Sequence, residues 1–361
     1  MAVKTFAAID IGSYELSMKI FEVSKKNGTR QIDHIRYSID MGTESYTTGK
    51  LSFERVDELC MILHEFSDIM KTYQVTDYKA YGTSAIRESK NRAILTDQVR
   101  LRTGIEMDIL SNSEQRFLDY KSIALQGQQF DEIIEKGTAI VDIGGGSIQI
   151  SLFDKDTLVS TQNLKLGVLR LRESMNFLNA SLSQYQNLIG EIVESQLSVY
   201  KKLYLKDRVI SNLIVVGDHI GDAVHKNVMT RADFLNFYDD MIYRSDEDAA
   251  GRCEVPEDVI SVLRPSLVVY RCFLEAADVE NIWMPGLHLT DGMAYEYAQQ
   301  NRLLKLGHDF DEDILAAARN AAKRYQCSKS HIKVCEDLAV GIFDKIKKSQ
   351  LEGNIAEIRQ T

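Results

Sequence analysis

Two stretches of the chain, residues 8–21 and 140–153, repeat one pattern of apolar and polar positions. Each begins with an apolar run that ends in Asp-Ile-Gly, turns through small or polar residues, and resumes with apolar residues at every second position. Such a pattern predicts a strand, a tight turn and a second strand. Because Asp-Ile-Gly falls at the same point in both copies, the repeat predicts two similar halves, each opened by a hairpin. The alternative is a pair of unrelated hydrophobic hairpins.

Strand-like and helix-like segments alternate over the rest of both halves. Amphipathic spacing predicts helices over residues 56–70 and about 182–203, and helices that begin near Ser84 and Ser111. Short apolar runs predict strands at residues 78–82, 105–110, 212–216 and 282–284. This order predicts an α/β fold in which each half is a sheet flanked by helices.

The pattern changes near Lys305, after which two amphipathic helices are expected at residues 311–325 and 330–348. We therefore expect two domains, residues 1–130 and 131–304, followed by a helical segment of residues 305–361. That segment has no glycine loop and no cluster of acidic residues, so we expect it to contribute little to a functional site.

Three residues in the helical segment have side chains of the metal-binding type. Cys327, His331 and Cys335 are four residues apart, which places them on one face if a single helix runs through them. Structural zinc sites usually include a fourth ligand and bend the chain around the ion. The spacing therefore favours the core face of a helix over a zinc site.

Composition narrows the class of protein. Hydrophobic residues make up 44% of the chain and charged residues 27%, as in ordinary globular proteins. The formal net charge of −10 argues against nucleic-acid binding, which requires a basic face. Five scattered cysteines suggest reduced thiols and a cytoplasmic protein rather than a disulfide framework. The sequence shows neither a signal-type apolar segment nor an 18-residue apolar run, so no membrane association is expected.

The strongest chemical signal is the run Asp142-Ile143-Gly144-Gly145-Gly146-Ser147. Three consecutive glycines allow backbone amides to turn inward and form a concave anion-binding site. Asp142, at the end of the preceding strand, could orient a hydrated Mg²⁺, which prefers carboxylate and phosphate oxygens. The run from Asp10 to Ser13 is the weaker partner of this motif, and a flexible hairpin turn is the alternative for both.

A second phosphate-type signal is the segment Gly82-Thr83-Ser84-Ala85-Ile86-Arg87. Ser84 is expected to be the N-cap of a helix, and the N-terminus of a helix attracts phosphate. Arg87 lies one turn further, and a guanidinium group matches the geometry of phosphate oxygens. The alternative is a surface arginine on an ordinary helix.

Glu114 has two interpretations. The spacing Ser111-x-x-Glu114 is that of a capping box, in which the glutamate closes the start of a helix. Alternatively, Glu114 points into a cleft and accepts a proton from an attacking water. The spacing alone favours the cap.

Taken together, these segments resemble the exopolyphosphatase and guanosine pentaphosphate phosphohydrolase family of the actin-like ATPase superfamily. The likeness extends over about residues 5–300 and rests on residues 10–13, 82–91, 111–118, 142–147 and 166–171. It implies two similar actin-like (ribonuclease H-like) domains with a cleft between them. It also implies that the helical segment is the truncated start of a larger helical domain.

The resemblance implies a role for each site residue. Glu114 would activate water, Arg87 would clamp a phosphoryl oxygen, and Asp142 with Asp10 would hold Mg²⁺. The residues implied in phosphate binding are Asp10, Gly12, Ser13, Thr83, Ser84, Gly144, Gly145, Gly146, Ser147 and Arg170. The implied activity is metal-assisted attack of water on the terminal phosphate of inorganic polyphosphate or guanosine pentaphosphate.

The chain departs from the family pattern at three places. The family reads Ser-Gly-x-Glu-Glu-Ala where this chain has Gln115 in place of the second glutamate, and it has a glutamate where this chain has Gln149. A later Gly-Gly-Thr motif is replaced by residues 217–219, Gly-Asp-His. The leading hypothesis is a phosphoanhydride hydrolase. The alternatives are a catalytically weakened protein that binds polyphosphate or an alarmone, and an ATP-dependent kinase or chaperone. The sequence leaves open whether the chain forms a homodimer.

Overall fold

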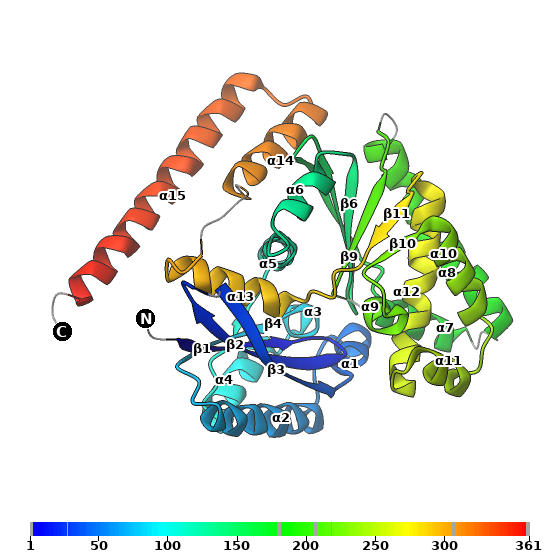
Figure 1. Ribbon diagram of the computed structural model, residues 1–361, viewed down its shortest axis with the longest axis horizontal. Coiled ribbons are helices and arrows are strands. Elements are labelled where there is room, and N and C mark those ends of the chain that lie inside the picture. Colours follow the sequence, from blue (N-terminus) through cyan, green and yellow to red (C-terminus); the bar gives the residue numbers. More distant parts are fainter. Residues whose placement is uncertain are drawn as a thin grey trace.

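The computed structural model describes residues 3–26, 28–178, 182–205, 208–217, 219–304, 308 and 310–358. Figure 1 shows two sheets, each flanked by helices, and two further helices toward the C-terminus. The predictions of an α/β fold in two halves and of a helical C-terminal segment are therefore confirmed.

The first sheet has five strands in the order β3-β2-β1-β4-β5, and β1 is antiparallel to β2 but parallel to β4. The strands are β1 (Lys4–Ile11), β2 (Glu15–Ser24), β3 (Gly28–Ser38), β4 (Asp77–Gly82) and β5 (Asp108–Ile109). The helices of this half are α1 (Met41–Thr48), α2 (Phe53–Thr72), α3 (Ser84–Glu88) and α4 (Arg92–Thr103).

The alternation of side chains along β1 gives the first sheet two covered faces. Ala7, Ile9 and Ile11 are fully buried on the face that packs against α2 and α4. Phe6 and Ala8 point to the opposite face and pack against α13 (Leu289–Gln300). Helices on both faces leave only the ends of the strands open for a site.

The second sheet has six strands in the order β10-β11-β9-β6-β7-β8. The strands are β6 (Thr138–Ile143), β7 (Ile148–Asp154), β8 (Thr157–Leu164), β9 (Asn212–Val216), β10 (Val228–Thr230) and β11 (Asn281–Trp283). The helices along this part of the chain are α7 (Val168–Phe177), α8 (Leu182–Tyr200), the π-helical turn η1 (Lys201–Leu205), α9 (Ile220–Val224), α10 (Arg231–Met241), α11 (Asp246–Cys253) and α12 (Glu257–Ala276).

The two faces of the second sheet are also covered. Val141 and Ile143 of β6 belong to a core that includes residues of α7, α8 and α12. Ile140 points the other way and packs with residues of α5 (Asn112–Ala124) and α6 (Gln128–Ile134). In Figure 1, α5 lies between the two sheets and α6 lies beside β6.

Helix α13 connects the halves. It lies within residues 131–304, which the sequence assigns to the second domain, but it packs against β1, β2 and α5. The approach to α5 is close, because a Cβ on Gly292 would lie 1.9 Å from the carbonyl oxygen of Leu118. The chain therefore returns to the first sheet after completing the second.

The C-terminal helices are α14 (Phe310–Arg324) and α15 (Lys329–Ile358). Helix α14 packs against β8, whereas α15 extends away from the sheets (Figure 1). The expected core face at Cys327, His331 and Cys335 is wrong, since all three residues are exposed. Among the described residues, no group of three or more His, Cys, Asp or Glu side chains is arranged to hold a metal ion.

Several predicted elements differ in length from the structure. The strand expected at residues 105–110 is reduced to two residues in β5, and the helix that begins at Ser84 has only five residues. The elements that were not predicted include strands β3, β8 and β10 and helices α1, α4, α6, α7 and α9–α13. No helix within the described ranges is long and apolar enough to span a membrane.

Candidate active site

The first Asp-Ile-Gly turn joins β1 to β2. Asp10 is the residue before the last in β1 and lies opposite Ser17 in the hairpin. The amide of Gly12 donates a hydrogen bond to the carbonyl oxygen of Glu15 over 3.0 Å, which closes the turn. The amide groups of the two intervening residues, Ser13 and Tyr14, lie at the end of the sheet where the chain turns.

The second turn, between β6 and β7, has the same backbone geometry. Asp142 is the residue before the last in β6 and lies opposite Gln149. The amide of Gly144 donates to the carbonyl oxygen of Ser147 over 2.9 Å. The repeat in the sequence is therefore a repeat in the structure, with matching residues at each hydrogen bond.

Both turns line one cavity between the two halves. The two aspartates are part of its wall, together with Thr83 and Ser84 at the start of α3. The residues predicted to bind phosphate that line this cavity are Asp10, Gly12, Ser13, Thr83, Ser84, Gly144, Gly145 and Ser147. The structure thus brings together most of the set that the sequence singled out.

The cavity contains more carboxylates than the sequence indicated. Burial, together with the nearby charges of Glu15 and Asp142, raises the pKa of Asp10 to about 7. Burial also raises the pKa of Asp142, although Gln149 and two arginines oppose the shift. Asp119, on α5, also lines the cavity, and burial with the charges of Asp142 and Asp10 raises its pKa well above the usual range.

Two of these carboxylates have an oxygen without a hydrogen-bond partner among the described residues. These atoms are Oδ1 of Asp10 and Oδ2 of Asp119. A buried polar atom without a partner is costly, and such atoms are often satisfied by an ion or a ligand. Unsatisfied carboxylate oxygens in a cavity therefore suit a bound cation.

The two glutamines that distinguish this chain both contact Asp142. Nε2 of Gln149 donates to Oδ2 of Asp142 over 3.1 Å, and Nε2 of Gln115 is 3.4 Å from the same oxygen. Gln115 lines the cavity, whereas Gln149 is buried beside it. Neutral amides therefore occupy the two positions where the family pattern has glutamates.

Glu114 does not enter this cavity. Its carboxylate accepts a hydrogen bond from the amide of Ser111 over 2.8 Å, and the Ser111 hydroxyl accepts one from the amide of Glu114 over 3.2 Å. The backbone hydrogen bond from Ser111 lowers the pKa of Glu114. The structure supports the capping interpretation, because Glu114 points toward the helix start while Gln115 faces the cavity.

Arg87 is also held away from the cavity. Nη1 donates to the carbonyl oxygen of Leu110 over 2.7 Å and lies 3.4 Å from Oε1 of Gln115. The guanidinium group therefore supports the start of α5 and the side chain of Gln115.

Arg170 supports the second turn rather than lining the cavity. Its Nε donates to the carbonyl oxygen of Gly146 over 2.8 Å, and Nη2 pairs with Glu88. Gly146 does not line the cavity either, because it packs against Tyr46 and Ser84; a Cβ there would lie 2.3 Å from Oγ of Ser84.

Tyr46 links the first turn to α3. Its hydroxyl lies 2.7 Å from Oγ of Ser13 and 2.9 Å from Oγ of Ser84. Ser84 is the first residue of α3 and Thr83 is the N-cap, without a side-chain capping bond, so the prediction of Ser84 as N-cap is wrong by one residue. Tyr46 holds two of the expected phosphate-binding hydroxyls in place.

Other residues that line the cavity were not predicted from the sequence as site residues. They are Tyr14 and Glu15 of the first turn, Gly217 and His219, and Ser266 of α12. Asp218, the middle residue of the replaced Gly-Gly-Thr motif, lies outside the described residues. Tyr14 and Glu15 directly follow Ser13 in the sequence. A turn that lines a cavity presents consecutive residues to it, so their position could have indicated that they line the cavity too.

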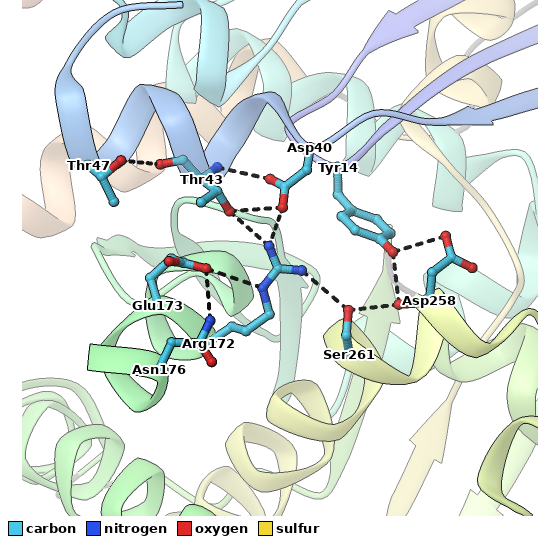
Figure 2. Close-up of polar contacts among 9 residues, drawn as sticks. All are labelled: Tyr14, Asp40, Thr43, Thr47, Arg172, Glu173, Asn176, Asp258 and Ser261. Atoms are coloured by element: carbon cyan, nitrogen blue, oxygen red, sulfur yellow. Dashed lines mark hydrogen bonds and ion pairs between the residues drawn. The ribbon is translucent and has the colours of Figure 1, made fainter. Parts of the chain in front are cut away.

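Polar contacts join the two halves beside the first turn (Figure 2). Arg172 of α7 forms an ion pair with Asp40, the N-cap of α1. The hydroxyl of Tyr14 donates to the carbonyl oxygen of Asp258, in α12, over 2.8 Å. These contacts hold the halves together at the edge of the cavity.

The duplicated hairpins and the shared cavity define an actin-like α/β fold with two matched phosphate-type loops. The chain matches the Ppx/GppA phosphatase family over residues 23–301. It therefore belongs to that family.

Relatives of known structure share the fold. An exopolyphosphatase from Cytophaga hutchinsonii superposes with a TM-score of 0.71 at 16% identity, covering 83% of this chain and 98% of that one. The Ppx/GppA family member of Aquifex aeolicus gives a TM-score of 0.67 at 20% identity, covering 83% of this chain and 99% of that one.

Curated relatives match over a shorter range. Exopolyphosphatase 1 of Mycobacterium tuberculosis is 23% identical over 164 residues, which are 45% of this chain and 46% of that protein. The bifunctional 3-dehydroquinate synthase/phosphatase of Fusobacterium nucleatum is 25% identical over 185 residues, 50% of this chain and 27% of that protein. The matched region thus spans less than half the length of these relatives.

Proposed function

We propose that this protein is a phosphoanhydride hydrolase that releases terminal phosphate from inorganic polyphosphate or guanosine pentaphosphate. The observation that carries the proposal is the pair of Asp-Ile-Gly turns that line one cavity. Amides at the open ends of both turns can receive phosphate oxygens from two sides. Membership of the Ppx/GppA phosphatase family supports the same reaction class.

The charge of the cavity supports a requirement for Mg²⁺. Asp10, Glu15, Asp119 and Asp142 line it, and no lysine or arginine does so among the described residues. A polyanionic substrate would be repelled by these carboxylates unless a cation accompanied it. The unsatisfied Oδ1 of Asp10 and the adjacent Asp142 fit this ion, which typically retains several waters and binds one or two carboxylates plus substrate phosphates.

When bound, Mg²⁺ would neutralise charge on the phosphoryl oxygens. The residues of this chain would do the rest. The two turns would fix the phosphate through their amides, and Ser13 and Ser147 would add hydroxyl donors. A carboxylate that lines the cavity, rather than Glu114, would accept the proton of the attacking water, because Glu114 closes its own helix.

A second candidate function is binding with little turnover. Gln115 faces the cavity and Gln149 contacts Asp142, and an amide cannot act as a general base. Such a protein would bind the phosphate chain with Mg²⁺ and release it intact.

One experiment separates these functions. The full chain is incubated with polyphosphate or guanosine pentaphosphate, with Mg²⁺ or with a chelator, and released phosphate is measured alongside binding by calorimetry. We expect Mg²⁺-dependent release, a loss of about a hundredfold or more in Asp142→Asn, and no change in the exposed control Asp97→Asn. Binding without release would support the second function, and the absence of both would reject the two proposals.

A further inference from the structure

Asp119 is a carboxylate to which neither the family motifs nor the sequence pattern assign a role. It lies on α5, one turn after Gln115, so both side chains point from the same face of the helix toward the cavity. Only 4% of Asp119 is exposed, and its Oδ2 has no hydrogen-bond partner among the described residues. A buried carboxylate aimed into a cavity with a free oxygen is costly to the fold unless something binds it.

The charged residues around Asp119 indicate which charge a group bound to its free oxygen would have. Asp10 and Asp142 line the same cavity and lie close enough to repel its carboxylate. Arg116, from the same helix, attracts it but forms no ion pair with it among the described residues, and Arg116 does not line the cavity. These three carboxylates and Glu15 line one cavity whose wall has no lysine or arginine among the described residues, and such a cavity calls for a bound cation.

The two glutamines strengthen the case for Asp119. Both direct an amide toward Oδ2 of Asp142, so that oxygen is already engaged. Neither amide adds negative charge. Asp119 and Glu15 are the other carboxylates that line the cavity among the described residues, and of these two only Asp119 has a buried oxygen without a hydrogen-bond partner.

We propose that Asp119 is a third carboxylate of the divalent-cation site and holds the hydrated ion together with Asp10 and Asp142. The inference rests on the proposed function, since it names a further residue of the same site. The described side chains do not form a ready-made three-ligand cluster, so Asp119 acts through water on the ion rather than as part of a direct cage. It restores the negative charge that Gln115 and Gln149 do not supply.

The test is calorimetric titration of the full chain with Mn²⁺ alone, without substrate. We expect Asp119→Asn to weaken Mn²⁺ binding by about tenfold or more, as loss of a residue that orients bound metal typically does. Asp97→Asn, the same change on an exposed surface of α4, is the matched control and should bind Mn²⁺ as the parent does.

A second measurement separates a cation-binding role from a structural one. Thermal unfolding of Asp119→Asn is followed with a chelator and with saturating Mn²⁺. Because the substitution removes a repelled carboxylate, the metal-free variant should melt at a higher temperature than the parent. The increase in melting temperature caused by Mn²⁺ should be smaller in the variant. A purely structural aspartate would instead lower the melting temperature equally under both conditions.

If Asp119→Asn does not fold, Asp119→Ser is measured in the same way. Unchanged Mn²⁺ affinity in a folded variant overturns the inference, even if the parent releases phosphate in a metal-dependent manner. Conversely, a parent that releases no phosphate but loses Mn²⁺ affinity on substitution of Asp119 rejects the proposed function and supports the inference.

Discussion

The two phosphate-type turns share a backbone but not their side chains. Each has an aspartate opposite a polar residue and an amide hydrogen bond that closes the turn. Residues 13–15 of the first turn are Ser-Tyr-Glu, whereas residues 145–147 of the second are Gly-Gly-Ser. The shared backbone provides the anion-binding geometry, and the different side chains give each turn its own surroundings.

The second turn needs its glycines for packing as well as for ligand binding. The amides of Val168 and Leu169, at the start of α7, donate to the carbonyl oxygens of Gly144 and Gly145 over 3.1 Å each. A helix can approach a turn this closely only where Cβ atoms are absent. The first turn instead extends Tyr14 toward α12, so it joins the halves through a side chain.

The largest effect should come from Gly167→Ala, which tests the close approach at the second turn. A Cβ on Gly167 would lie 2.2 Å from the carbonyl carbon and oxygen of Gly145, and backbone atoms cannot move aside as a flexible side chain can. We expect a loss of about 2–3 kcal/mol in the free energy of unfolding, measured in urea, and loss of phosphate binding.

Gly190→Ala is the control, because a Cβ there would meet no atom within 4 Å. Within a helix, this change should be neutral or stabilising by up to about 1 kcal/mol. Equal behaviour of the two variants would show that the second turn tolerates side chains at its contact with α7.

The second largest effect on stability is expected at Glu15. This residue is charged, whereas the equivalent residue of the second turn is Ser147. Burial raises the pKa of Glu15 to about 7, with Asp222 and Asp258 adding to the shift and Arg36 opposing it. The folded protein therefore binds a proton more tightly than the unfolded chain, so stability should fall as pH rises from about 4.5 through 7.

Glu15→Gln should remove this contribution and stabilise the metal-free protein by about 2 kcal/mol at pH 8, with little change at pH 4. Urea unfolding at both pH values, with a chelator present, measures the difference. Some pH dependence should remain in the variant, because Asp10 titrates in the same window. A variant no more stable than the parent at pH 8 would contradict the expectation.

A smaller difference should separate the equivalent glycines that close the turns. A Cβ on Gly12 would lie 2.6 Å from the carbonyl oxygen of Glu15, whereas on Gly144 it would lie 3.5 Å from that of Ser147, an ordinary contact. We expect Gly12→Ala to cost about 1–2 kcal/mol and Gly144→Ala about 0.5 kcal/mol or less. Equal losses in urea unfolding would mean that the two turns are interchangeable.

The sequence was sufficient for the duplicated core because the signal there is local. Asp-Ile-Gly and the alternating residues after it specify strand, turn and strand within 14 residues of each copy. Strand β3 was not predicted, because it is an edge strand whose many polar, partly exposed residues give no clear strand pattern. Residues 289–300, which form α13, were assigned to the second domain because their packing on the first sheet depends on contacts distant in sequence.

The site was predicted less well than the fold for the same reason. The turns themselves follow from local sequence, but Asp119 and Tyr46 reach the site only through the packing of α5 and α1. Arg170 and Arg87 have guanidinium groups of the kind that bind phosphate. In the structure, however, these groups donate hydrogen bonds to the carbonyl oxygens of Gly146 and Leu110. A motif indicates which residues are suitable, and only the tertiary structure decides which of them face the cavity.

The smallest effect should come from Glu114→Gln. A glutamine side chain can also accept the hydrogen bond from the amide of Ser111, so the capping box should survive with a loss of about 0.5 kcal/mol or less. Because Glu114 lies outside the cavity, the rate of phosphate release should stay within about twofold of the parent. Steady-state release and urea unfolding are measured on the same preparation, with Asp142→Asn as the variant expected to lose activity. A folded Glu114→Gln protein whose rate fell about a hundredfold, as for removal of a general base, would return Glu114 to the reaction. The cap would then have to open during turnover, and the two turns would no longer suffice to define the site.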